Sequence, residues 1–300
     1  MLLCNSIVRF SYTPPSIPRS RRHQPCLARL EGSLDAQLQH WVAEAQLCEG
    51  ATELSAAECS AAEVRTRKWV DRTLTSAGLA FCPYTSSAEL SSTGLEDLGV
   101  PPAPVLYETC ASGETSHLMA EFWVACANMV AEGEEGLSSI LLSAPGWDDE
   151  WDAWHRVVFP MIEASVAAAG LESFLGVVCF HPFYVTPDEG WRSANKFGHM
   201  HSKQRLREYL DEHDPPLSSA TGARELGWAG DYQRRSPHAT INVLWASQLE
   251  IAETRRRSSS LYARNLRTAL RRGEEVLECE ALEERAQLIG VDAASCAHAP

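Results

Sequence analysis

Four short apolar runs stand out in the middle and later part of this chain. They cover residues 105–110, 138–144, 173–180 and 240–245, and each has the length and composition of a strand. Between the first three, apolar residues recur at three- and four-residue steps, as they do on one face of a helix. This alternation predicts an α/β fold with a small mixed, largely parallel sheet of about four strands and packed helices.

Two helices are expected to connect the first three strands. One starts at Ser116, whose hydroxyl can cap it, and the other spans about 148–169 and ends before Gly170. Pro160 falls inside the second helix and should distort it, because proline has no amide hydrogen to donate. A further helix is predicted over about 60–76.

The remaining segments divide the chain around one α/β domain, residues 60–272. Residues 31–58 carry an apolar stripe at helical spacing and are expected to form an N-terminal helical extension. Residues 181–237 form a long insertion with one obvious helix, about Ser202–His213, so a lid, a binding loop or a disordered segment is expected there. Residues 273–300 are interpreted as an acidic C-terminal tail.

The first thirty residues have the composition of an organelle transit peptide. They contain five arginines, four serines and no acidic residue. They lack the long apolar core of a secretory signal, and a basic disordered tail is the alternative interpretation. We therefore expect an organelle protein, with the plastid favoured over the mitochondrion.

Charge and cysteine spacing limit the classes of function. The formal net charge of the whole chain is −14, and it falls to about −19 without the five basic residues of 1–30, so nucleic-acid binding is disfavoured. No apolar run approaches the eighteen residues of a membrane span. The ten cysteines contain no pair at zinc-ribbon or thioredoxin spacing, so no metal site is predicted and a reducing compartment is favoured.

His181 is the sharpest pointer to a site. It follows the apolar run 173–180 and precedes Pro182, which ends strand pairing because proline cannot donate to the ladder. Ligands of α/β proteins usually bind at the carboxyl ends of strands. His181 is thus a candidate acid or base, and the structural alternative is a cap that satisfies loop carbonyls.

Other residues complete the candidate site. Cys82, before a proline, is a candidate nucleophile or else a buried structural thiol, and Tyr184 joins the catalytic candidates. Arg234 and Arg235 carry guanidinium groups suited to a carboxylate or phosphate, although they could equally hold internal acids. The substrate-binding candidates are completed by Ser236 and Asn242.

A metal site is the weaker alternative for one histidine pair. His199 and His201 would lie on the same side of an extended segment, and His213 follows. A solvated loop is the preferred interpretation of these histidines.

Four motifs resemble those of a known family. They are Cys82-Pro83-Tyr84 after a helix containing Trp69, Phe180-His-Pro-Phe-Tyr184, Arg234-Arg-Ser-Pro-His238 and Tyr262-Ala-Arg-Asn265. In order and spacing they resemble the bacterial family called domain of unknown function 1415, over about residues 60–272. The chain departs from the family's pattern at Asn242, Trp245 and Ala246, where the family has a His and an Arg-Glu pair. The family carries no established activity to transfer.

Together these observations favour a small-molecule enzyme acting on an anionic substrate. Its cleft would be built from Cys82, His181, Tyr184, Arg235, Ser236 and Asn242, with His181 as acid or base and Arg235 as the anion-binding group. The competing hypothesis is a non-catalytic ligand-binding or assembly protein in which the same motifs fix loop geometry. The sequence leaves open whether the protein is an enzyme, whether it uses a cofactor or binds a metal, and its oligomeric state.

Overall fold

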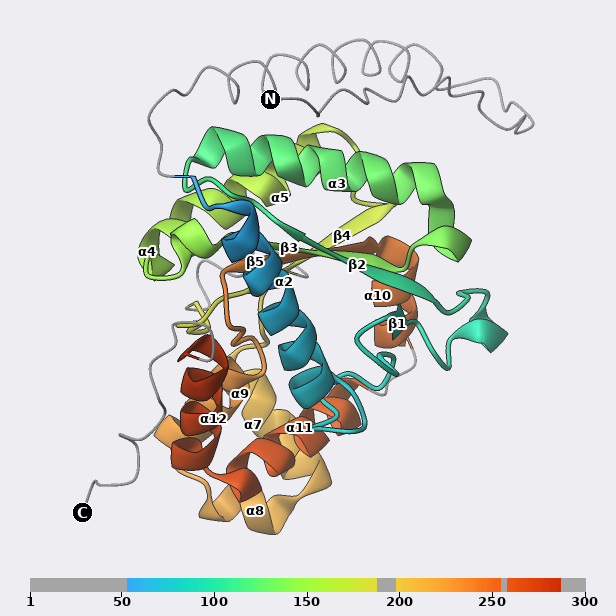
Figure 1. Ribbon diagram of the computed structural model, residues 1–300. Coiled ribbons are helices and arrows are strands. Elements are labelled where there is room, and N and C mark those ends of the chain that lie inside the picture. The colour runs from blue at the N-terminus through green and yellow to red at the C-terminus, as the bar shows by residue number, and fades with distance from the viewer. Residues whose placement is uncertain (1–52, 188–197, 255–257, 287–300) are drawn as a thin grey trace, which may run out of the picture.

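The computed structural model describes residues 53–187, 198–254 and 258–286 (Figure 1). The expected transit peptide, residues 1–30, lies outside the described residues. So do most of the predicted N-terminal extension and the last part of the predicted acidic tail.

A five-stranded mixed sheet forms the centre of the molecule. Its strands, in spatial order, are β1 (Leu90–Ser91), β2 (Ala103–Thr109), β3 (Ser139–Ser143), β5 (Thr240–Trp245) and β4 (Leu175–Phe180). The four longer strands coincide with the four apolar runs of the sequence. An α/β fold with a small mixed sheet and packed helices is therefore confirmed.

The directions of the strands differ from the largely parallel sheet that the sequence predicted. β2 and β3 pair in parallel, but β5 is antiparallel to both β3 and β4, and β1 is antiparallel to β2. β2, β3 and β4 consequently run the same way, and crossover connections that contain helices join them. β5 inserts between β3 and β4 in the opposite direction, which leaves only one parallel pair.

Helices cover both faces of the sheet. α3 (Thr115–Gly136) and α5 (Phe159–Ala168) lie on one face, and α2 (Ala56–Trp69) and α10 (Ala246–Thr254) lie on the other (Figure 1). α5 is preceded by α4 (Trp151–Ala153) and by a π-helical turn, Trp154–Val158. That turn comes just before Pro160, where the missing amide hydrogen interrupts regular helical bonding.

Side chains alternate between the two faces along each strand. Ile140 and Leu142 of β3 belong to the large core beneath α3 and α5. Leu141, between them, belongs with Val178 of β4 to a smaller cluster that contains Trp69 of α2. This period of two gives the sheet two apolar faces, and the candidate site lies on the face of the smaller cluster.

The segments expected to be an insertion and a tail form a helical lobe. It contains α7 (Lys203–His213), α8 (Pro215–Ala220), α9 (Ala223–Tyr232), α11 (Ser258–Arg272) and α12 (Glu274–Ala286) (Figure 1). Residues 198–237 are thus largely helical rather than one helix within a loop. α12 differs from the expected tail because Leu277 is fully buried and Glu278 and Glu284 pair with Arg235 and Arg72. Among the described residues, no helix is long and apolar enough to cross a membrane.

Candidate functional site

A cavity of about 230 Å³ lies on the face of the sheet opposite α3 and α5. Its floor is formed by side chains of β2, β3, β4 and β5, including Leu141 and Phe180. Its walls come from the 81–85 loop, residues 233–234 and the starts of α10 and α11. All four motifs noted in the sequence contribute to the lining, through Cys82, Phe180, Arg234 and the pair Tyr262 and Asn265.

The cavity is mainly apolar and has a few polar groups that converge on it. Three of the predicted site residues line it, namely Cys82, Arg234 and Asn242. Gln233 and Asn265 add side-chain amides. Small-molecule sites commonly combine apolar walls with a few placed polar groups, so this cavity is the leading candidate site among the described residues.

The loop that carries Cys82 is fixed by the end of the π-helical turn Val70–Leu74. The carbonyls of Arg72, Thr73 and Leu74 accept hydrogen bonds from the amides of Leu79, Phe81 and Cys82, at 2.7, 3.0 and 3.1 Å. Gly78 permits this close return, because a Cβ there would lie 1.9 Å from the Arg72 carbonyl oxygen. Cys82 is therefore held by backbone bonds rather than by packing alone.

Two residues of α11 hold the same loop from the other side. The guanidinium of Arg264 donates to the carbonyl of Ala80, and the Asn265 amide donates to the carbonyl of Phe81 at 2.9 Å and to Gln233 at 3.0 Å. Ala80 has a φ of 58°, a left-handed conformation that is uncommon for a residue with a Cβ. Such strain persists only where the surroundings hold it, and it is concentrated at functional sites.

Arg234 brings a positive charge to the cavity. Its guanidinium carbon lies 5.3 Å from the centre of the Phe180 ring, in a cation–π contact. Within the part of the chain that the structure describes, no carboxylate pairs with it. No Asp or Glu is found among the described residues that line the cavity.

Asn242 places an amide in the middle of the sheet. Its neighbours across the two ladders are Leu141 and Val178. Its Oδ1 atom is buried and has no hydrogen-bond partner among the described residues. An unpaired buried carbonyl costs on the order of 1–3 kcal/mol, so a bound molecule that donates a hydrogen bond to it would recover that energy.

His181 does not line this cavity, and its environment corrects the expectation of a solvent-accessible acid or base. The side chain is 0% exposed. Its Nδ1 accepts a hydrogen bond from the Phe183 amide at 3.0 Å, so Nε2 carries the hydrogen and donates to the Trp147 carbonyl at 3.0 Å. Burial lowers the pKa of His181 to about 4. The neutral imidazole thus acts as a cap that joins two loops, which was the structural alternative.

Tyr184 is also part of the core. Its hydroxyl accepts a hydrogen bond from the Met200 amide at 2.8 Å and lies 3.2 Å from Nδ1 of His199. Burial raises the pKa of this phenol. Like His181, it lines neither this cavity nor the smaller one described next.

Arg235 and Ser236 lie at a second, smaller cavity of about 60 Å³ beside α12. Arg235 is paired with Glu278, which also accepts a hydrogen bond from the Trp228 indole at 2.7 Å. The Ser236 hydroxyl donates to the carbonyl of His238 at 2.5 Å. The predicted cleft is therefore divided, and Arg235 holds an internal acid rather than facing the cavity of Cys82.

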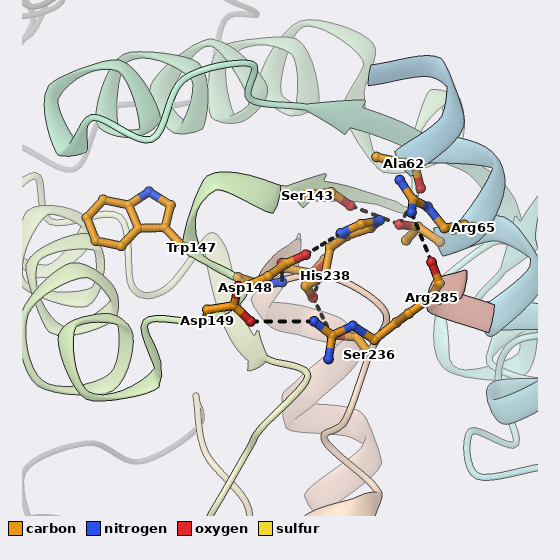
Figure 2. Close-up of polar contacts among 12 residues, drawn as sticks. Ala62, Arg65, Ser143, Trp147, Asp148, Asp149, Ser236, His238 and Arg285 are labelled. Atoms are coloured by element: carbon orange, nitrogen blue, oxygen red, sulfur yellow. Dashed lines mark hydrogen bonds and ion pairs between the residues drawn. The ribbon is translucent and has the colours of Figure 1, made fainter. Parts of the chain in front are cut away.

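A second polar cluster lies where β3 ends and β5 begins. Asp148 bonds to Nδ1 of His238 and to the amide of Ala239, both at 2.7 Å. Figure 2 shows Asp148 pointing at His238, while the adjacent Asp149 points at Arg285, 3.7 Å away. Neither His238 nor Asp148 lines either described cavity. This cluster ties the ends of the two strands together.

The histidines considered for a metal site contact aromatic side chains. His199 lies against Phe159 and Tyr184, and His201 lies against Tyr209 and Tyr262. In the described ranges, no group of three or more His, Cys, Asp or Glu residues could hold a metal ion.

Sequence reasoning missed several residues of the cavity. Gln233 was not singled out, and Tyr262 and Asn265 were recognised only as part of a motif without a role. The available signal was the position of Gln233 directly before the Arg234-Arg-Ser-Pro motif and the Arg-Asn pair in α11.

No family model, curated protein or solved structure matches this chain. The resemblance to the domain of unknown function 1415 family therefore depends on the four motifs alone, and the functional argument depends on the geometry of the cavity.

Proposed function

We propose that this protein binds a small organic anion in the cavity of Cys82, Arg234 and Asn242. Arg234 holds the anionic group, and the side-chain amides around it orient the rest of the polar part. The apolar floor contacts the body of the ligand. This retains the small anionic ligand predicted from the sequence and assigns its recognition to Arg234 in place of Arg235.

The observation that carries the proposal is the charge of the cavity. The chain as a whole has a formal net charge of −14. The described lining of the cavity nevertheless contains one arginine and no carboxylate. A cation at a largely apolar surface attracts an anion strongly, because the low local dielectric weakens the screening of the charge.

Size and lining limit the ligand. A volume of about 230 Å³ is below the roughly 300–1,000 Å³ typical of pockets for drug-sized molecules. Phe81, Leu141, Phe180 and Leu244 offer apolar contact, and the amides of Gln233 and Asn242 offer hydrogen bonds. A short carboxylate or phosphate ester with a partly apolar body fits this description.

Binding without catalysis is the form of the proposal that the histidine geometry favours. The enzyme hypothesis used His181 as acid or base, and both nitrogens of that side chain are engaged with protein groups. Catalysis at this cavity would have to use a group that lines it, and Cys82 is the strongest candidate.

The test is a thermal-shift screen that compares each short carboxylate with its uncharged amide. A ligand at a hundred times its dissociation constant should add about 2.7 kcal/mol to the free energy of unfolding. We expect acids to stabilise the protein and amides not to. Arg234→Gln should remove the shift, whereas Arg235→Gln, at the neighbouring arginine, should keep it. Equal shifts for acid and amide, or a shift retained in Arg234→Gln, would overturn the proposal.

A further inference from the structure

The side-chain oxygen of Asn242 is an unpaired acceptor in the wall of the Arg234 cavity. Several buried side-chain nitrogen and oxygen atoms of the described residues have no hydrogen-bond partner, and Oδ1 of Asn242 is the one that belongs to the lining of this cavity. Two neighbouring amide oxygens are already engaged, because Oε1 of Gln233 accepts from Asn265 at 3.0 Å and Oδ1 of Asn265 accepts from Arg264 at 3.1 Å. The unsatisfied acceptor therefore belongs to Asn242 and not to the amides in general.

The strand register places this oxygen close to the anion-binding group. Asn242 of β5 lies opposite Val178 of β4, and Phe180 follows Val178 two residues along the same face of β4. Diagonal neighbours of this kind lie roughly 7–8 Å apart. Arg234 lies over the Phe180 ring, with its guanidinium carbon 5.3 Å from the ring centre. A short molecule held by Arg234 can therefore extend to Asn242.

The charge of the lining decides which kind of donor suits the Asn242 oxygen. An ammonium group there would repel the Arg234 guanidinium, and no Asp or Glu of the described lining would compensate its charge. A charged group at an apolar surface also loses hydration that nothing there replaces. A carbonyl or ether oxygen has no hydrogen to donate. A hydroxyl is small, neutral and able to donate, so it fits this position.

We propose that the ligand of this cavity is a short hydroxy acid. Its carboxylate lies against the guanidinium of Arg234, and its hydroxyl donates a hydrogen bond to Oδ1 of Asn242. The inference rests on the proposed anion site and deepens it, because it names the second group that the ligand must carry. It selects hydroxy acids over amino acids and over acids without a donor.

The experiment measures dissociation constants for a set of four-carbon acids by isothermal titration calorimetry. Butyrate carries the anion and no donor. The 2-, 3- and 4-hydroxybutyrates add a hydroxyl at increasing distance from the carboxylate, and the enantiomers are titrated separately. The tightest of them is then compared with its amino analogue, which has an ammonium group, and with its methoxy analogue, which keeps the oxygen but cannot donate. These comparisons need no substitution in the protein.

We expect the tightest hydroxybutyrate to bind about tenfold more tightly than butyrate, the effect of one hydrogen bond to a buried group that is otherwise unpaired. The amino and methoxy analogues should bind no more tightly than butyrate. Asn242→Ala should bring the hydroxy acid and butyrate to equal dissociation constants. Gln248→Ala is the control, because Gln248 lines the same cavity but its amide nitrogen donates to the carbonyl and hydroxyl of Ser138, both at 3.1 Å. The preference for the hydroxy acid should remain in that variant.

Three results would overturn the inference: no hydroxybutyrate that binds more tightly than butyrate, an amino or methoxy analogue that binds as tightly as the hydroxy acid, or a preference that survives in Asn242→Ala. A preference lost equally in Gln248→Ala would also overturn it, since the shape of the cavity and not the Asn242 oxygen would then be responsible. The outcomes separate the inference from the proposed function. Carboxylates that stabilise the protein through Arg234 without any preference for a hydroxyl would leave the anion site standing and remove the hydroxy acid. If no carboxylate binds, both fail.

Discussion

Replacing Asn242 by Leu should stabilise the ligand-free protein and abolish anion binding. Asn242 lies in the interior strand β5, between Leu141 and Val178 of its two neighbours, and its buried Oδ1 has no partner among the described residues. Leucine removes this unpaired group, and the adjoining cavity has room for the larger side chain. A residue kept at a cost in stability is expected where binding needs it.

The size of the effect follows from the unpaired oxygen. Leaving a buried polar group unsatisfied costs about 1–3 kcal/mol. Asn242 is partly buried rather than fully buried, so the lower end applies, and Asn is also a poor strand former. We expect a gain of about 1 kcal/mol in the free energy of unfolding, measured by urea denaturation at equal m-value.

The matched control is Asn265→Leu. The Asn265 amide donates to the Phe81 carbonyl and to Gln233, and its oxygen accepts from Arg264 at 3.1 Å. Its loss leaves these groups unpaired and should cost about 2–4 kcal/mol. The two substitutions remove the same functional group and should change stability in opposite directions. Destabilisation of similar size in both would refute the reasoning and make Asn242 a structural residue.

Four further outcomes are expected. The buried His181 side chain is neutral, with a pKa of about 4 against about 6.5 in the unfolded chain, so it takes up a proton on unfolding at mildly acidic pH. The free energy of unfolding should therefore fall by about 2 kcal/mol as the pH falls from 7 to 5. His181→Gln should remove that loss from urea midpoints, and an unchanged pH dependence would contradict the assignment. Burial raises the pKa of the Glu163 carboxyl to about 7, so the protonated carboxyl stabilises the fold at low pH and this stabilisation is lost as the pH rises toward 7. Glu163→Gln should remove this loss from the pH dependence of the urea midpoint, and an unchanged pH dependence would exclude the effect. Ending the chain at Gly273 removes buried Leu277 and the ion pairs of α12 and should cost at least about 2 kcal/mol, whereas an unchanged urea midpoint would mean that α12 adds nothing. Deleting residues 1–30 should leave the melting temperature nearly unchanged, and the same residues fused to a reporter should direct import into isolated plastids; unfolding on deletion or failure of import would contradict the transit prediction.

The sequence was sufficient to locate the four longer strands, because each is a short apolar run with a clear end, but it did not predict the two-residue strand β1. It could not show that β5 inserts between β3 and β4, since that depends on how the chain returns after the long 181–237 segment. It also did not predict α8, which begins at Pro215-Pro216. In the structure those prolines occupy the first turn, where an amide hydrogen is not needed, and Asp214 caps them.

The candidate site was predicted in part. Cys82, Arg234 and Asn242 line one cavity, as the convergence of motifs suggested. His181 was misinterpreted because an imidazole at a strand end can be either open to solvent or covered. The cover comes from Trp151, whose ring centre lies 5.0 Å from that of His181, and from the Trp147 carbonyl. Both belong to a segment some thirty residues earlier, and local sequence carries no signal of that contact. Arg235 was misassigned for the same reason, because Glu278 lies in a segment interpreted as a tail.

A crystal structure of the protein with a carboxylate from the thermal-shift screen tests the central claim most directly. The account predicts that the carboxylate lies against the guanidinium of Arg234, with its body on the apolar floor near Phe180 and a polar group within hydrogen-bond distance of Asn242. A carboxylate bound outside this cavity, or an Arg234 guanidinium paired with one of the protein's own acids, would contradict it.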